Sequence, residues 1–326
     1  ELSISLVELD LDMFNTKRWV DLCEKTYGYE SGVKRGKNCD IFYAKIINDV
    51  GTYIVAPPFG DCITLEPRHF PDLERFTASL PDLAIRLKIC SKVDPEIDNV
   101  IVEDGGFVHA IEYDSYDDWN RNKIKCKFRN QVNQGAKSGL RVRVSKEKAD
   151  VVSFWETHAK LRTNKFGEIP QPRQFFLNIH KAYFEEDKGF LIGAYDQNSN
   201  LVAGIVVLLE EQVAYYKFAA SQPAFLALRP NNLLIDRLIA YLDEEGVRKL
   251  NLGYTGSSDQ YRGLRKYKLS AGAIEMPRRI LKTHPYASLN MERVEEINCQ
   301  VLEFTRRSPS MGEVDQFSEK CYSYFV

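Results

Sequence analysis

Helical and strand-like segments alternate along most of the chain, and this limits the fold more than any other feature. The pattern is clearest in the second half, where two amphipathic helical segments precede three apolar strands joined by tight turns. One more helix and two strands complete the series. These segments are 150–163, 172–186, 190–195, 201–209, 213–219, 231–245, 249–252 and 273–276. This order of two helices, a three-stranded meander, one helix and two strands predicts a compact α/β (or α+β) unit.

The first half has a similar order of segments. We expect strands at 2–9, 41–47, 52–56 and 84–90, and helices at 16–27, 67–79 and 116–138. The turn Asp104-Gly105-Gly106 between 100–103 and 107–112 favours a hairpin. The first half is thus interpreted as a second, diverged copy of the same plan. We predict domains at 1–145 and 146–285, followed by a C-terminal helix (about 286–306) and polar tail at 286–326.

Composition excludes several classes of protein. The 326 residues are 44% hydrophobic and carry a net charge of −2, which excludes a protein that coats nucleic acid by bulk charge. No apolar run reaches the roughly 18 residues of a membrane-spanning helix, and the chain does not start like a signal peptide. The seven cysteines form no CxxC and the histidines no HExxH, so we expect reduced thiols, no metal site and a cytoplasmic location.

The first candidate for chemistry is a basic stretch from Trp119 to Lys146. It contains nine Lys or Arg and no Asp or Glu. On one helix, Arg121, Lys125 and Arg129 would form a cationic row without an opposing carboxylate. Such a stretch is either a solvated surface or an anion site for phosphate or pyrophosphate.

Two further candidates lie later in the chain. Arg229-Pro230-Asn231-Asn232 opens a helix, whose free N–H groups can bind an anion, although ordinary capped helices begin in the same way. A cluster of cations with aromatic residues between them, Tyr261 to Lys268, follows the strand that ends at Asn251-Leu252-Gly253. A lysine there could stabilise an oxyanion, and the alternative is again surface charge.

These segments, in this order, resemble the FemAB-like branch of the GNAT acyltransferase superfamily, nearest to its BioF2-like acetyltransferase domains. The resemblance covers about 116–276. It consists of the basic helix with Arg129, Val132 and Gly139, the linker from His158 to Arg173, the Arg229–Leu234 helix start, Asn251-Leu252-Gly253, and Gly263-Leu264 followed by Tyr267-Lys268. Asn251 stands where the family often has Asp, and the usual GNAT pyrophosphate loop is not found at 229–234. The sequence therefore shows no dedicated general base.

The resemblance implies two tandem GNAT-like domains with mixed central sheets. It implies an N-acyltransferase that moves an acyl or aminoacyl group to an amine, such as that of a cell-wall or glycan precursor. Acyl-CoA or aminoacyl-tRNA would be the co-substrate, with no tightly bound cofactor, and the acceptor would be a phosphorylated small molecule or glycopeptide. Lys268 matches the family's catalytic lysine. The expected substrate- or donor-binding residues are Lys123, Lys127, Arg129, Arg162, Arg229, Asn231, Asn232, Asn251, Arg262 and Lys266.

A second hypothesis comes from another class of protein. The same cations could belong to a non-catalytic domain that binds RNA or an anionic saccharide. Binding would then weaken steeply as the salt concentration rises.

Overall fold

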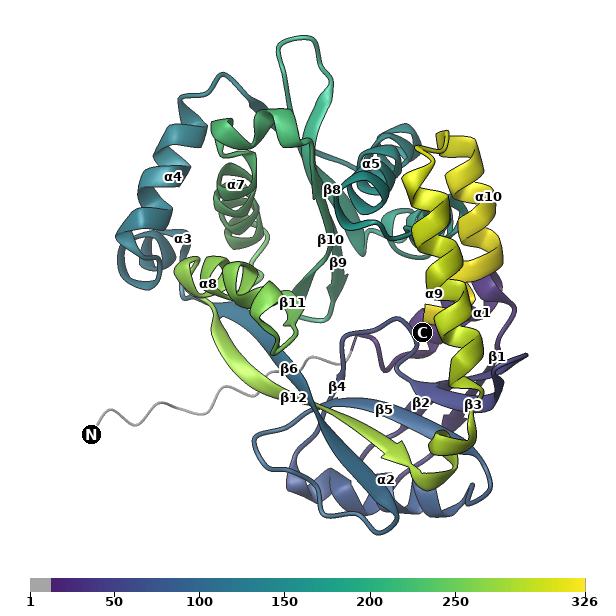
Figure 1. The fold of residues 1–326 in the computed structure, drawn as a ribbon. Coiled ribbons are helices and arrows are strands. Elements are labelled where there is room, and N and C mark those ends of the chain that lie inside the picture. Colours follow the sequence, from purple (N-terminus) through teal and green to yellow (C-terminus); the bar gives the residue numbers. More distant parts are fainter. Residues whose placement is uncertain (1–12, 326) are drawn as a thin grey trace.

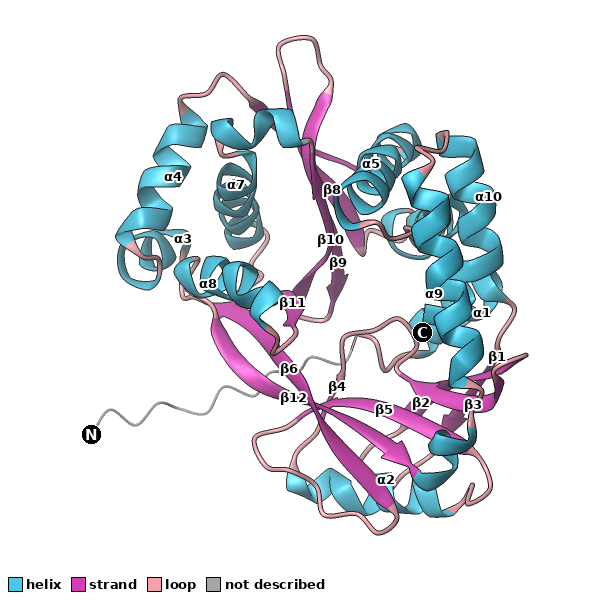
Figure 2. Cartoon of the chain, viewed as in Figure 1, coloured by secondary structure: helices cyan, strands magenta, loops and turns pink. Residues whose placement is uncertain are grey.

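The computed structural model describes residues 13–325, so the strand expected at 2–9 lies outside the described residues. Over residues 13–325, twelve strands form one mixed sheet (Figures 1 and 2) in the order β1-β2-β3-β5-β12-β6-β11-β10-β9-β8-β7, with β4 beside β5. The strands are β1 (Glu30–Lys34), β2 (Ile41–Asn48), β3 (Gly51–Ala56), β4 (Ile63–Thr64), β5 (Ala84–Cys90), β6 (Val100–Glu112), β7 (Arg141–Ser145), β8 (Gly189–Tyr195), β9 (Leu201–Glu210), β10 (Val213–Ser221), β11 (Lys249–Thr255) and β12 (Ile274–Thr283). The predicted α/β class with a mixed sheet is confirmed.

Helices cover both faces of this sheet. The α-helices are α1 (Lys17–Tyr27), α2 (Phe70–Ala78), α3 (Tyr116–Asp118), α4 (Cys126–Ala136), α5 (Lys148–Leu161), α6 (Arg173–Ile179), α7 (Pro230–Glu244), α8 (Arg262–Ser270), α9 (Met291–Arg306) and α10 (Met311–Cys321). Short 3-10 or π turns extend several of them. No helix among residues 13–325 is long and apolar enough to cross a membrane.

Each half of the chain repeats one plan. In the first, the antiparallel meander β1-β2-β3 leads through α2 to β5, which lies parallel to β3. In the second, the meander β8-β9-β10 leads through α7 to β11, parallel to β10. The internal similarity expected from the order of segments is therefore present in the topology.

The two halves exchange their last strands. The β6 strand of the first half pairs with β11 of the second, whereas β12 of the second half pairs with β5 of the first. In Figure 1, β6 and β12 run together from one half to the other. Instead of two separate sheets, the halves share one. The division at residue 145 stays a prediction.

The core of the second half explains its nearly unbroken apolar strands. In β9, Ile205 and Val207 pack beneath α7, and the alternate residues Val206 and Leu208 pack beneath α5 and α6. Because both faces are covered, these strands are apolar along their whole length and do not alternate with polar residues.

The prediction of a hairpin at 100–112 is wrong. β6 continues straight through Asp104-Gly105-Gly106. The two glycines serve close packing and not a turn: a Cβ on Gly105 would lie 2.9 Å from the Arg278 carbonyl oxygen, and one on Gly106 only 2.0 Å from that of Thr255. The pair of glycines admits β12 and β11 on either side of β6.

The single long helix expected at 116–138 is also wrong. A π-helical turn over Trp119–Lys123 follows α3, and the chain is extended at Ile124 and Lys125 before α4 begins. The row of Arg121, Lys125 and Arg129 on one helix therefore does not form. The segment after 306 differs too, because the expected polar tail contains α10, which packs with α9 over α5 (Figure 2).

Candidate active site

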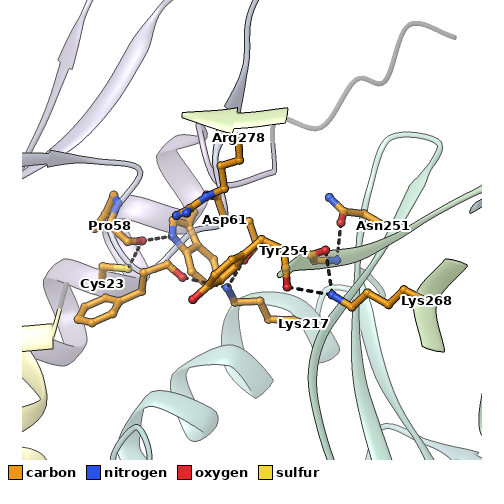
Figure 3. A network of polar contacts seen from close by, with 11 residues as sticks. Cys23, Pro58, Asp61, Lys217, Asn251, Tyr254, Lys268 and Arg278 are labelled. Atoms are coloured by element: carbon orange, nitrogen blue, oxygen red, sulfur yellow. Dashed lines mark hydrogen bonds and ion pairs between the residues drawn. The ribbon is translucent and has the colours of Figure 1, made fainter. Parts of the chain in front are cut away.

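The parallel strands β10 and β11 separate close to the sheet centre. They pair only from Val213 to Tyr215 and from Lys249 to Asn251. Beyond that point β10 follows β9, and β11 follows β6 with a register shift between Asn251 and Tyr254. Polar side chains from both halves of the chain meet where the strands part (Figure 3).

Asn251 stabilises the irregular part of β11, where the strand shifts register against β6. Its side chain is buried, and its Oδ1 accepts a hydrogen bond of 2.7 Å from the Gly253 N–H. Gly253 has a φ of +73°, which favours glycine. This turn coincides with the register shift of β11 against β6 between Asn251 and Tyr254.

Lys268 occupies the position that the carbonyl groups of Gly253 and Tyr254 define. Its Nζ donates to the Gly253 oxygen at 3.0 Å and to the Tyr254 oxygen at 2.9 Å. The side chain is 5% exposed, and burial lowers the lysine pKa to about 8, a shift that the Asp61 charge opposes. An ammonium has three N–H groups, and no third acceptor for Lys268 lies within residues 13–325. One donor is therefore left for a ligand.

Asp61 reaches this place from the first half of the chain. A Cβ on Gly253 would lie 3.2 Å from Asp61 Oδ2, so the absence of a side chain at 253 lets the carboxylate approach. The Asp61 carbonyl accepts 2.6 Å from Arg278 Nε, and its carboxylate lies 3.9 Å from Lys217 Nζ. Two lysines, Lys217 and Lys268, thus interact with the Asp61 carboxylate, and Arg278 holds the backbone that carries it.

Lys217 joins the two halves beneath that carboxylate. Its Nζ donates to the Phe59 carbonyl at 2.9 Å and lies 4.2 Å from the ring centre of Phe14. The Trp19 indole N–H donates to the neighbouring Pro58 carbonyl at 2.6 Å. Burial lowers the pKa of Lys217, and the Asp61 charge opposes this shift. The segment that carries Asp61 is therefore held at a defined position against β10.

Tyr254 forms the solvent-facing side of the group. Its side chain is 41% exposed, yet burial by the surrounding protein raises its pKa. The guanidiniums of Arg278, 4.4 Å from the ring centre, and of Arg162 oppose that rise. Tyr254 is thus the accessible member of this group of residues.

Of the residues predicted from sequence, Asn251, Lys268 and Arg162 are brought together here. Asp61, Lys217 and Arg278 were missed. The only signal for Asp61 was its place directly after Pro57-Pro58-Phe59-Gly60, which breaks the strand pattern. Nothing local marked Lys217, the one cation of the largely apolar strand β10, or Arg278, which stands beside Arg279 in β12.

A second group of predicted residues lies where α4 packs on the start of α7. Arg229 Nε donates to Gln134 at 3.2 Å, Asn232 Nδ2 donates to Gln131 at 3.3 Å, and Asn231 Nδ2 donates to Ser221 at 3.3 Å. These polar side chains hold the two helices and the end of β10 together.

The cations of the basic stretch from Trp119 to Lys146 have different surroundings, and several of them have partners within the protein. Arg129 donates to the carbonyls of Asn120 and Arg121, so it ties α4 to the preceding turn. The expectation of cations without opposing carboxylates is wrong, because acidic residues from outside the stretch pair with four of its cations. Pairs form between Arg121 and Asp117, Lys123 and Asp118, Arg143 and Asp150, and Lys146 and Asp187.

The remaining predicted residues lie on the surface. Lys127 on α4 and Lys266 on α8 are exposed, and Arg262 contacts Asp259 at 3.9 Å with most of its side chain in solvent. Arg162 also pairs with Glu168. All seven cysteines are free, and three of them are buried.

Together, the sheet and its covering helices have the fold of FemX. The FemX crystal structure superposes with a TM-score of 0.61 at 14% identity, over 82% of this chain and 92% of that chain. The C-terminal domain (DUF2156) of a putative lysylphosphatidylglycerol synthetase from Agrobacterium fabrum gives a TM-score of 0.55 at 13% identity, over 90% and 94% of the two chains. The structure of L-PGS from Bacillus licheniformis gives 0.54 at 11% identity, over 88% and 97%.

Residues 122–268 match the family described as acetyltransferase (GNAT) domain. The match includes Lys268 as its last residue. No curated protein sequence matches the chain. The resemblance to the GNAT superfamily, with a FemX-like fold, is therefore confirmed, whereas the BioF2-like assignment stays a prediction.

Proposed function

We propose that this protein is an N-acyltransferase that moves an acyl or aminoacyl group from a CoA thioester or an aminoacyl-tRNA to an amine. One observation carries the proposal: within the GNAT domain, the Lys268 ammonium is held by two carbonyls, keeps one free N–H and feels the Asp61 carboxylate. Such an arrangement offers both a donor for developing negative charge and an acceptor for a proton.

Each group then has a role in the transfer. The amine nitrogen attacks the carbonyl carbon, and the carbonyl oxygen becomes an oxyanion that receives the third N–H of Lys268. Asp61 accepts the proton that the amine loses. The C–S or C–O bond of the donor then breaks, and the leaving thiolate or alkoxide takes up the proton that Asp61 accepted, which restores the carboxylate.

The surrounding cations suit an anionic substrate. Arg278 lies beside the accessible Tyr254 ring, and the charge of Arg162 acts on the same side chain. Guanidinium groups bind phosphate and carboxylate through paired donors. We propose that Arg162 and Arg278 contact the acceptor, a phosphorylated small molecule or glycopeptide such as a cell-wall or glycan precursor. A lysylphosphatidylglycerol synthetase among the structural neighbours makes a phospholipid acceptor the first other compound to test.

The basic surface of α4 and the start of α7 would serve the donor. Lys125, Lys127 and Lys137 are exposed and have no ion pair within residues 13–325. With Lys123, Arg229 and the α7 N-terminus, they would attract the phosphates of CoA or of tRNA. The three exposed lysines, Lys125, Lys127 and Lys137, also favour the second candidate, a non-catalytic domain that binds RNA or an anionic saccharide.

One experiment separates the donors and the two candidates. The protein is incubated with amine acceptors and either acetyl-CoA or charged tRNA, and products are identified by mass spectrometry. Lys268→Met should lower product formation about 10²–10³-fold, whereas Lys148→Met, which replaces an exposed lysine on α5, should not lower it. Thermal shifts with CoA and with tRNA report binding separately. Salt-sensitive RNA binding without product from any donor would favour the non-catalytic candidate.

A further inference from the structure

The strand β5 contains a buried lysine without a partner. Lys88 is 4% exposed, and its Nζ has no hydrogen bond or ion pair within residues 13–325. Lysines are almost never fully buried unless they are paired, because a buried charge loses its hydration. No motif contains Lys88, and the proposed transfer does not use it. Its place in the core therefore needs a reason.

The alternation of side chains along β5 determines which way Lys88 points. Leu87 and Ile89 pack in the core cluster beneath α2. Ala84 and Cys90 belong instead to the core cluster that contains residues of both halves. Successive side chains of a strand point to opposite faces, so Lys88 shares the face of Ala84 and Cys90 and is turned toward the contact between the halves. An apolar residue there would fill the same space without a buried charge.

Strand pairing brings Arg278 of β12 to the same face. Arg278 pairs with Cys90, two residues along β5 from Lys88, so Arg278 and Lys88 are diagonal neighbours. Long side chains reach each other across such a diagonal, whose Cα atoms are roughly 7–8 Å apart. Arg278 is 6% exposed, and it donates to the carbonyls of Asp61, from Nε at 2.6 Å, and Gly105, from Nη1 at 3.0 Å. Its Nη2 has no partner in the described part of the chain, so the N–H groups of that nitrogen are available to a ligand.

The Asp61 carboxylate does not balance these cations. Ile63 of β4 pairs with Ile89 in a parallel register, so the chain that leads into β4 through Asp61 runs alongside Lys88. The carboxylate of Asp61 is already engaged, because it lies 3.9 Å from Lys217 Nζ (Figure 3). Three largely buried cations, two lysines and one arginine, thus face one carboxylate, which leaves a net positive charge.

Two other ionisable groups on this face do not supply the missing negative charge. Glu103, in the same row of the sheet as Lys88, pairs with Lys282 at 2.7 Å. The Cys62 thiol is neutral, because its hydrogen bond with Cys90 and its burial raise its pKa. Burial, and then the neighbouring cations, lower the pKa of Lys88. An additional negative charge beside the ammonium would offset this cost.

We propose that Lys88 and Arg278 bind a carboxylate group of the acceptor. The role of this carboxylate rests on the function proposed above, and it narrows the acceptor to an amine with a free carboxylate, such as the peptide part of a glycopeptide. The two oxygens of a carboxylate match the Lys88 ammonium and the free Arg278 Nη2. A phosphate dianion has more acceptor sites, and in this enclosed place some of them would stay unpaired. Arg278 also covers the Tyr254 ring, which is 41% exposed, so the carboxylate would enter past Tyr254.

Replacement of Lys88 should therefore have two opposite effects. Lys88→Met keeps an unbranched side chain without the charge, so the protein without ligand should melt at a higher temperature at pH 7. Binding of a carboxylate should weaken by about 10–100-fold, the loss expected for a hydrogen bond between charged groups. A residue that merely packs in the core would lower stability when replaced and would not change the response to a carboxylate.

The test measures thermal shifts of the intact chain with probes of matched size at one ionic strength. N-acetylalanine carries a carboxylate, N-acetylalaninamide has a neutral amide in its place, and inorganic phosphate is a different anion. We expect N-acetylalanine alone to raise the melting temperature of the wild type, and no probe to raise that of Lys88→Met or Lys88→Gln. Lys92→Met, which replaces an exposed lysine just after β5, is the control and should respond as the wild type does. No shift with N-acetylalanine, a shift with phosphate alone, or equal shifts in the Lys88 variants would overturn the proposal.

Kinetics separate the carboxylate site from the proposed function. For an amine acceptor that gives a product, the KM of the free carboxylate should be lower than that of its amide, and the ratio of the two values should approach one in Lys88→Met. If the N-acetylalanine shift depends on Lys88 but no donor gives a product, the carboxylate site stands and the transferase proposal fails. If transfer occurs with the same KM ratio in the wild type and in Lys88→Met, Lys88 does not bind the acceptor.

Discussion

The Asp61 carboxylate of the first half lies against Gly253 of the second, 3.2 Å from where a Cβ at that glycine would be. Gly253→Ala would therefore push Asp61 away from Lys268 and strain a backbone with a φ of +73°. We expect transfer to be lost and stability to fall by about 1–3 kcal/mol, the usual range for such strain. Gly312→Ala on α10, where an added Cβ would meet no atom of another element within 4 Å, is the control in thermal unfolding and transfer assays.

Asp61→Asn tests the proposed proton acceptor. An amide keeps the size of the side chain but cannot take up a proton, so kcat should fall by about 10²–10⁴, the usual contribution of a general base. The KM for the donor should change little. Asp259→Asn, whose carboxylate is 92% exposed near α8, should retain full activity. A wild-type kcat for Asp61→Asn would show that another group accepts the proton.

The pH dependence of transfer should follow Lys268. Only the ammonium can donate to an oxyanion, and its pKa is lowered to about 8, so the rate should decline as the pH rises through 8. Lys268→Met should lower the rate about 10²–10³-fold at pH 7 and abolish that decline. A decline at pH 8 that persists in Lys268→Met would assign it to another group.

Arg129 and Lys127 should respond differently, although sequence reasoning placed both in an anion site. Arg129→Met removes three hydrogen bonds to the Asn120 and Arg121 carbonyls, so it should lower the melting temperature. Lys127→Met should leave stability unchanged and weaken binding of CoA or tRNA, with a smaller salt dependence. Differential scanning fluorimetry and binding titrations at two salt concentrations measure both effects.

Asp72 should stabilise the first half in a pH-dependent way. Its carboxylate accepts from the N–H groups of Lys37, Asn38 and Cys39 at 2.9, 2.7 and 3.1 Å, and these bonds lower its pKa. A lowered pKa in the folded state adds stability above the unfolded pKa of about 3.9, and this stability is lost as the pH falls. Asp72→Asn should thus lower the melting temperature at pH 7, with a difference that shrinks below pH 4.

Local patterns predicted much of the fold. The apolar strands β8 to β10 and helix α7 lie close to their expected ranges, because their turn residues and periodicity are local signals. The prediction of a hairpin at Asp104-Gly105-Gly106 was wrong because glycines in the sequence do not distinguish a turn from a strand that packs closely against its neighbours. The helix at 116–138 failed because the break at Ile124 depends on packing against α8 and its end, where Ser270 accepts from Lys125.

The site was predicted only where one segment carried its own motif. Lys268 and Asn251 belong to neighbouring segments with family-like residues. Asp61, Lys217 and Arg278 come from three distant segments that approach each other only after the halves have exchanged strands. Pairing of β12 with β5 brings Arg278 opposite Cys90, and no spacing in the chain records this contact.

The exchanged strands also determine how this protein can move. Two halves joined by one flexible linker can rotate about a hinge and close over a substrate. In this protein, β6 and β12 both cross between the halves and are hydrogen-bonded to each other. Rotation of one half against the other would break hydrogen bonds of both strands in the shared sheet at once. The two halves must therefore keep their relative position while substrates enter and leave. Any closure is confined to side chains and to loops such as the one that carries Asp61.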